Sequence, residues 1–129
     1  MKYQDEIINS LKELTTNVKY FAGVGWWYLK YDNYQMVYIP SKYSSNTIRI
    51  CIPHFDNIEH YNFEQLSTAI NATNREVKYA KVVMLGNGSI AINYDHKNDC
   101  ENDLHSILLH MLKTLCFAAE YLKSKLSEK

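Results

Sequence analysis

The segment KVVMLGNGSIAINYD, at residues 81–95, constrains the fold more strongly than any other part of this chain. Its two apolar runs flank Asn87-Gly88, a dipeptide typical of the tight turn in a β-hairpin. A two-residue type I′ turn there would place three pairs opposite each other on one face: Leu85 with Ile90, Val83 with Ile92, and Lys81 with Tyr94. That face is apolar except at Lys81, so the hairpin needs an apolar layer to cover it.

A second hairpin is predicted in the aromatic run WWYLKYDNYQMVYIP, at residues 26–40. Asp32 and Asn33 both tolerate turn geometry, and Pro40 ends the second strand. One face then carries Trp27, Leu29, Tyr31, Tyr34, Met36 and Tyr38, and the other carries Trp26, Tyr28, Lys30, Gln35, Val37 and Ile39. One layer of helices can cover only one of these faces, which leaves apolar surface for a second cover.

Hydrophobic spacing predicts a further strand and a first helix. The stretch TIRICIP, at residues 47–53, alternates as a strand that Pro53 is expected to stop. Near the start of the chain, four apolar residues recur at helical spacing: Ile7, Leu11, Leu14 and Val18. Gly23 and Gly25 are expected to end that helix before the aromatic hairpin.

Two more helices are indicated by capping residues and apolar stripes. Asn62 and Gln65 have the spacing of a capping box, and the stripe behind them is Phe63, Leu66, Ile70, Thr73 and Val77. Asn98 and Glu101 repeat this spacing before the final and longest helix. Its stripe is Leu104, Leu108, Met111, Leu115, Ala118, Leu122 and Leu126, and Ile107, Leu112, Phe117 and Tyr121 broaden it.

These elements predict an α+β fold in the order α-β-β-β-α-β-β-α. Five antiparallel strands would form one sheet with the helices packed on one face, because each amphipathic stripe needs an apolar sheet to cover it. The chain has 129 residues and no long linker, so residues 1–129 are expected to form a single domain.

Composition narrows the classes of function. The 14 basic and 14 acidic side chains balance, so no overall field attracts nucleic acid or an anionic membrane. No apolar run approaches the roughly 20 residues that span a bilayer. The three cysteines, Cys51, Cys100 and Cys116, are odd in number and widely spaced, which favours reduced thiols and a cytoplasmic location.

The residues that could carry chemistry do not form a recognised catalytic motif. His105 and His110 lie five residues apart, which does not match a helical zinc pair. A metal-dependent or acid–base enzyme would need His54, His60, Asp95 and His96 to converge. The sequence therefore favours a protein that is not an enzyme, with no cofactor and no bound metal. A small-molecule sensor with a pocket between sheet and helices is the other alternative.

A resemblance to a known family rests on INATNREVKYAKVVMLGNGSIAINYD and the leucine-rich helix that follows it. Ile70, Asn71 and Asn74, followed by the hairpin from Lys81 to Asp95, resemble the YbjN family of sensory transduction regulators and the wider type III secretion chaperone-like fold. The resemblance covers residues 62–126. It implies a non-catalytic regulator or chaperone-like protein that forms a homodimer and binds a protein or peptide.

The sequence thus predicts a partner-binding homodimer and divides its key residues into two groups. The partner-binding candidates are the aromatic residues of the first hairpin: Trp26, Tyr28, Trp27, Tyr31, Tyr34 and Tyr38. Asn71 and Asn74, one helical turn apart, are expected to bond backbone groups that the fold leaves unpaired. Asn87 and Gly88 are expected to shape the turn of the second hairpin.

Overall fold

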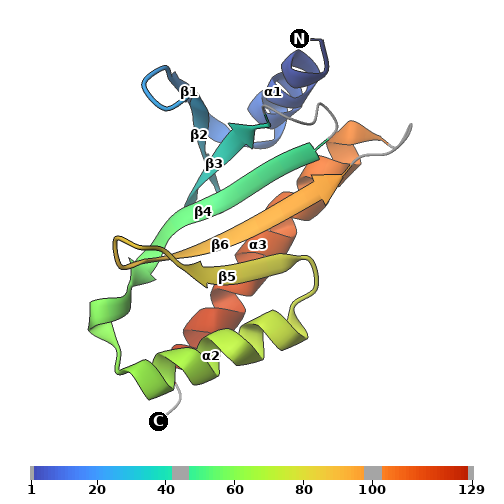
Figure 1. The fold of residues 1–129 in the computed structure, drawn as a ribbon. Helices are drawn as coiled ribbons and strands as arrows, with labels where there is room; N and C mark the ends of the chain where they lie inside the picture. Colours follow the sequence, from blue (N-terminus) through green and yellow to red (C-terminus); the bar gives the residue numbers. More distant parts are fainter. Residues whose placement is uncertain (1, 42–46, 98–102, 128–129) are drawn as a thin grey trace.

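The computed structural model describes residues 2–41, 47–97 and 103–127, which form one antiparallel sheet with three α-helices (Figure 1). The elements run α1 (Lys2–Leu14), β1 (Thr16–Phe21), β2 (Trp26–Tyr31), β3 (Tyr34–Pro40), β4 (Thr47–Asn57), the 3-10 helix η1 (Ile58–His60), α2 (Phe63–Glu76), β5 (Ala80–Met84), β6 (Ser89–Lys97) and α3 (Leu104–Leu126). The predicted α+β class is confirmed. The sheet has six strands in the order β1-β2-β3-β4-β6-β5, so the prediction of five was wrong.

The additional strand is β1, which the sequence analysis assigned to the end of the first helix. Val18 continues the helical spacing of Leu14, but the chain leaves the helix after Leu14. The Thr15 hydroxyl donates to the Leu11 carbonyl at 2.6 Å, and Asn17 adopts a positive φ of 58°. The positive φ of Asn17 is not helical, and from Thr16 the chain forms an edge strand paired with β2.

The turn between β2 and β3 forms where the sequence predicts it. Asp32 and Asn33 have φ values of 49° and 70°, and a type I′ turn requires positive φ at both central positions. Tyr31 then pairs with Tyr34, and Leu29 pairs with Met36. The predicted division of this hairpin into two faces therefore holds in the structure.

Pro53 does not stop the next strand, in contrast to the prediction. β4 continues to Asn57, and its register against β6 shifts between Ile52 and Asp56. A bulge of this kind accommodates a proline because the hydrogen bonds between the strands are already interrupted there, so the missing N–H of proline is not needed.

The hairpin at Asn87-Gly88 has a longer turn than predicted. Gly88 donates to the Leu85 carbonyl at 3.0 Å and has a φ of 89°, the pattern of a turn over Gly86 and Asn87 followed by a glycine bulge. The observed pairs are therefore Met84 with Ile90, Val83 with Ala91, Val82 with Ile92, Lys81 with Asn93, and Ala80 with Tyr94. This slip by one residue turns β5 over, so that Val82 rather than Val83 faces the core.

The helices largely follow their predicted stripes. The Asn62 side chain caps α2 by accepting from the Gln65 amide at 2.7 Å. Leu66, Ile70 and Thr73 are buried as expected, but Phe63, at 76% exposed, is not. The predicted cap of α3 at Asn98 and Glu101 lies outside the described residues, and Asp103 caps the observed helix through the amide of His105.

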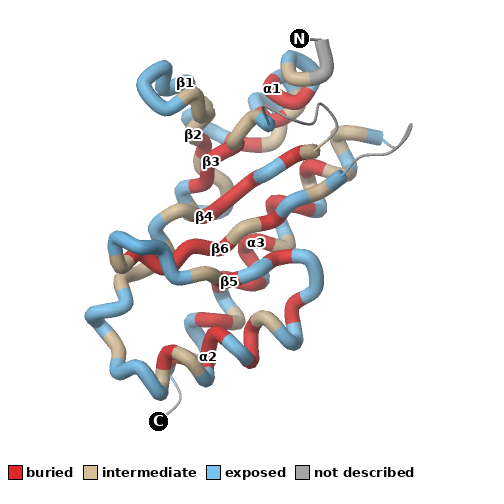
Figure 2. The backbone as a smooth tube through the Cα atoms, viewed as in Figure 1, coloured by how far each residue is buried: buried red, intermediate tan, exposed pale blue. Residues whose placement is uncertain are grey.

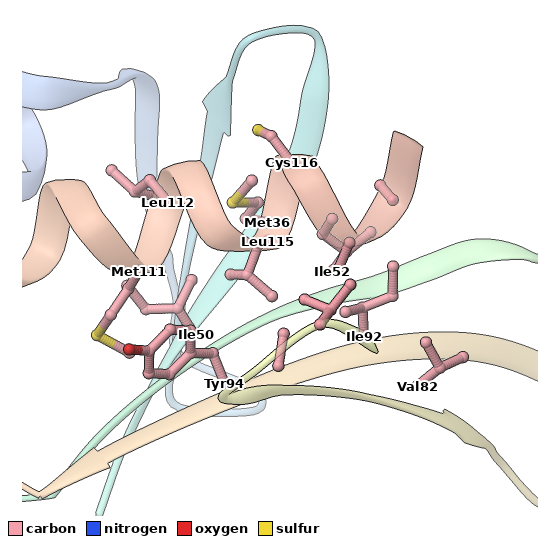
Figure 3. Close-up of a cluster of buried hydrophobic side chains, with 14 of the residues drawn as sticks. Met36, Ile50, Ile52, Val82, Ile92, Tyr94, Met111, Leu112, Leu115 and Cys116 are labelled. Atoms are coloured by element: carbon pink, nitrogen blue, oxygen red, sulfur yellow. The ribbon is translucent and has the colours of Figure 1, made fainter. Parts of the chain in front are cut away.

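The core lies between α3 and one face of the sheet (Figure 3). Its buried helical residues come from α1, α2 and α3. Its sheet residues come from alternate positions only, including Met36, Ile50, Ile52, Val82, Ile92 and Tyr94. We call this helix-covered side the inner face and the opposite side the outer face. In Figure 1, α3 passes behind β4 and β6, so the viewer looks onto the outer face.

Candidate functional site

The outer face of the sheet carries apolar residues that α1, α2 and α3 leave uncovered. Val37, Cys51 and Ala91 are buried there, at 0%, 5% and 3% exposed, although they do not belong to the core cluster. Figure 2 shows the buried segments of β3, β4 and β6 in red. Val37 and Cys51 are direct partners across β3 and β4, so neighbouring strands bring these residues together. Side chains of neighbouring strands therefore form a buried apolar centre on the outer face.

Larger side chains lie at one end of this centre. Phe21 pairs with Trp26 across β1 and β2, and its ring stacks on Tyr28 with centroids 4.5 Å apart. Ile39 lies two residues beyond Val37 on β3, on the same face. We call Phe21, Trp26, Tyr28 and Ile39 the outer aromatic patch; Phe21 is 43% exposed and the other three are part-exposed. An exposed apolar group of this kind marks an interaction surface more often than a stability device.

Charged residues border the patch. Arg49 donates two hydrogen bonds to Asp95 across β4 and β6, at 2.6 and 2.8 Å, and the hydrogen bond to Asp95 raises the pKa of Arg49. Both side chains are about half exposed, so the pair contributes little stability. On the other side, the Lys19 ammonium lies 5.9 Å from the centre of the Phe21 ring. An apolar centre within a polar rim is the usual anatomy of a protein interface.

The structure divides the six predicted partner-binding residues between the two faces. Trp26 and Tyr28 lie on the outer face, whereas Tyr38 is 3% exposed inside the core. Trp27, Tyr31 and Tyr34 are part-buried and pack against the core from the inner side. Lys12 of α1 lies 5.9 Å from the Trp27 ring, and the Tyr34 hydroxyl donates to Glu120 of α3.

The three asparagines that were predicted to have structural roles, Asn71, Asn74 and Asn87, have different surroundings. Asn74 forms two hydrogen bonds with the backbone of Val82: its side-chain oxygen accepts at 2.7 Å and its side-chain nitrogen donates at 3.1 Å. This joins the end of α2 to β5. Asn71 is exposed on the same helix. Asn87 accepts from the Ser89 amide at 3.0 Å and so shapes the turn, together with Gly88 in its left-handed conformation.

The residues of the alternative enzyme site do not come together. Asp95 is held by Arg49, and His54, which contacts the Ser89 hydroxyl at 3.2 Å, lies five residues beyond Arg49 on β4. That separation corresponds to roughly 17 Å of strand. His60 instead contacts Asp56 at 2.6 Å. Within the described part of the chain, no three metal-ligating side chains form a group.

Asp56 is the centre of a small polar cluster. Partial burial raises the pKa of its carboxyl group, but hydrogen bonds from Tyr61, the Asn57 amide and His60 outweigh this effect, so the pKa is lowered overall. Burial and the bond to Asp56 raise the pKa of Tyr61 to about 12. The cluster connects β4 to the residues just before α2.

The described thiols are poor nucleophiles. Cys51 and Cys116 are buried and form no disulfide. Burial raises the pKa of the Cys51 thiol to about 12 and that of Cys116 to about 11, so both stay protonated near neutral pH. Cys100 lies outside the described residues.

The structure also contains a cleft at one end of the sheet. Its volume is about 530 Å3, and it lies beside the end of β6 and the first turns of α3. Tyr79, Tyr94, His96, Ser106 and His110 are among its lining residues. No sequence signal predicted it, because the lining residues come from three separate segments.

Comparisons with known proteins show a shared fold. A crystal structure of an uncharacterized protein from Methanothermobacter thermautotrophicus superposes with a TM-score of 0.67 over 96% of this chain and 96% of that chain. The two sequences are 13% identical, so the likeness concerns the fold alone.

The sequence comparisons and the search for membrane helices give negative results. No protein-family model matches the sequence, and no curated protein matches it significantly. None of the helices within the described residues is long and apolar enough to cross a membrane.

Proposed function

We propose that this chain is a non-catalytic cytoplasmic binding module that works as a homodimer and holds a protein or peptide segment. The outer aromatic patch is the proposed contact surface, with Trp26 and Tyr28 at its centre. Among the predicted aromatic residues, these two are the ones that the fold presents away from the helices.

The observation that carries this proposal is the absence of a covering layer over the outer face within the described residues. All the sheet residues of the core cluster lie on the inner face, yet the outer face has a buried apolar centre and a part-exposed aromatic patch. Aromatic rings contribute strongly at interfaces because they bury large areas and lose little conformational entropy.

The sequence resemblance supports the same proposal. The YbjN family and the type III secretion chaperone-like fold imply a dimeric protein that binds partners without catalysis. In this chain, the Asn74 side chain forms two hydrogen bonds with the backbone of Val82 in the hairpin. These contacts give Asn74, one of the residues that carry the resemblance, a structural role. No catalytic residue is carried over from the resemblance.

The dimer is tested by size-exclusion chromatography with light scattering at micromolar concentrations. We expect the unmodified chain to have the mass of a dimer and the Trp26→Ser/Tyr28→Ser variant to have the mass of a monomer. Tyr20→Ser is the control, because Tyr20 is 49% exposed on β1 but its ring lies against Trp27 on the inner side. A monomer at all concentrations would remove the dimer from the proposal.

Partner binding is tested with the Trp27→Phe variant, in which Trp26 is the remaining tryptophan. Extended peptides rich in apolar side chains are titrated while the fluorescence of Trp26 is recorded. We expect saturable changes that the Tyr28→Ser substitution weakens. Flat titrations across a varied peptide set would contradict peptide binding.

A further inference from the structure

The cleft beside β6 exists because β6 is longer than its neighbour. β6 continues to Lys97, whereas its pairing with β5 ends where Ala80 meets Tyr94. The chain between α2 and β5 forms one wall of the resulting opening, and Ser106, Ile107 and His110 of α3 form another. A volume of about 530 Å3 is within the range of small-molecule sites.

Three rings form an aromatic wall in this cleft. The Tyr79 and Tyr94 rings are nearly parallel, with centroids 6.0 Å apart and an interplanar angle of 18°. His110 meets both of them edge-on, at 6.1 and 6.2 Å. Tyr94 and His110 also contact each other at 3.4 Å between the hydroxyl oxygen and Nδ1. Tyr94 is buried, so the accessible face of this wall belongs mainly to Tyr79, which is 65% exposed.

The backbone of Tyr79 is unusual for its residue type. Its φ is 77°, in the left-handed region. The other non-glycine residues with positive φ in the described part of the chain are Asn17, Asp32 and Asn33, whose short polar side chains tolerate that conformation. A tyrosine there is strained, and glycine would relieve the strain. Strained residues of this kind concentrate at functional sites.

The polar lining of the cleft combines hydroxyl and imidazole groups with two charged residues at its edge, Asp95 and Lys97. Burial, followed by the neighbouring Tyr79, raises the pKa of Tyr94, so its hydroxyl stays protonated near neutral pH. The Asp95 carboxylate is already paired with Arg49. The Nε2 atom of His96 is buried and has no hydrogen-bond partner among the residues that the structure describes, so a polar atom entering from the cleft could satisfy it.

We propose that this cleft binds a small planar heteroaromatic molecule that stacks on Tyr79 and forms hydrogen bonds with the imidazole and hydroxyl groups behind it. Stacking favours a flat ring, and the hydroxyl and imidazole groups favour a ligand with ring nitrogens or hydroxyl groups that can form hydrogen bonds. The cleft shares no lining residue with the outer aromatic patch, and this proposal does not depend on the proposed partner binding.

The test uses the full chain with adenine and indole as probes and cyclohexanol as a non-aromatic control. Protein-observed NMR follows each titration to about 5 mM, which detects dissociation constants near 1 mM. We expect saturable shifts for at least one aromatic probe, concentrated at Tyr79, Tyr94 and His110, and none for cyclohexanol.

The decisive variant is Tyr79→Gly, because glycine adopts the observed backbone without strain and removes the ring. We expect a fold at least as stable as the unmodified chain and a loss of probe affinity of about tenfold or more. Tyr20→Ala, at an exposed tyrosine on β1 outside both proposed sites, is the matched control and should leave probe binding unchanged. Absence of saturable binding, or binding that Tyr79→Gly leaves intact, would overturn the proposal.

Discussion

The two faces of the sheet are built from the same strands but are covered in different ways. On β3, Met36 and Tyr38 point into the core beneath the helices, and Val37 between them points to the outer face. Both sides have residues that are almost fully buried. The inner face reaches this state through three helices, whereas among the described residues the outer face reaches it through neighbouring strand side chains.

This difference shows that a sheet face can bury a few residues fully and still expose apolar surface to water. Val37 and Cys51 are protected, but Phe21, Trp26 and Tyr28 around them keep part of their rings in water. On the inner side, the large aromatic Tyr38 is fully enclosed. The outer face therefore has apolar area that a partner can still remove from water.

The largest expected effect compares one buried residue from each side. Leu115→Ala, in α3, should lower the free energy of unfolding by about 2–5 kcal/mol, because it leaves a cavity under the helix layer. Val37→Ala should lower it by only about 1.5 kcal/mol, since it removes two carbon atoms from a face that has no second layer to lose. Urea denaturation measures both values. Equal losses would mean that the outer face is a second core, and the comparison would fail.

A smaller effect is expected where α2 is fixed to β5 on the inner side. Asn74→Ala should lower the free energy of unfolding by about 1–3 kcal/mol, because it leaves the Val82 amide and carbonyl without their side-chain partner. Asn71→Ala is the control on the exposed side of the same helix and should change stability by less than about 0.5 kcal/mol. Thermal or urea denaturation of both variants distinguishes them; similar losses would contradict the assigned role of Asn74.

The smallest expected effect is a pH-dependent one at Asp56, where β4 leads toward the helix layer. Asp56→Asn should lower the free energy of unfolding by about 1 kcal/mol near pH 7, since it weakens the bonds to Tyr61 and His60. The folded pKa of Asp56 lies below its ordinary value of 3.8, so this contribution is present above about pH 4. It is lost as the pH falls through the folded pKa.

Denaturation curves recorded from pH 7 down to acid conditions check this expectation. The stability difference between Asp56→Asn and the unmodified chain should shrink in the acid range. Glu59→Gln, an exposed neighbour, serves as the control. A difference that stays constant across that range would show that the carboxylate charge does not matter.

The parts of the fold that the sequence predicted are those with strong local signals. Asp32 and Asn33 tolerate positive φ, so the first hairpin and its two faces follow directly from local chemistry. The stripe of α3 is long enough that its period is unambiguous, and Leu108, Met111, Leu115, Ala118 and Leu122 are all buried.

The errors occurred where two local signals overlap. Val18 fits the helical spacing of Leu14 as well as the alternation of a strand, and the backbone of Asn17 decides between them. Gly86 before Asn87 allows a turn one residue longer, which changes the register of β5. Pro53 is accommodated by a bulge that depends on β6, a strand distant in sequence.

The candidate sites were predictable to different degrees. Alternation in β2 and β3 identified both Trp26 and Trp27, but only the packing of the helices shows which of them faces outward. The cleft depends on the strained backbone of Tyr79 and on the meeting of α3 with β6, and neither leaves a pattern in the sequence.

The central claim, that the outer face is the surface a partner covers, is tested most directly by its two adjacent tryptophans. Trp27→Phe leaves Trp26 as the reporter of the outer face, and Trp26→Phe leaves Trp27 as the reporter of the inner face. Acrylamide quenching is measured for each variant while the protein concentration rises through the range of dimer formation. We predict that quenching of Trp26 falls while that of Trp27 stays constant. Constant quenching of Trp26, or a fall confined to Trp27, would contradict the account.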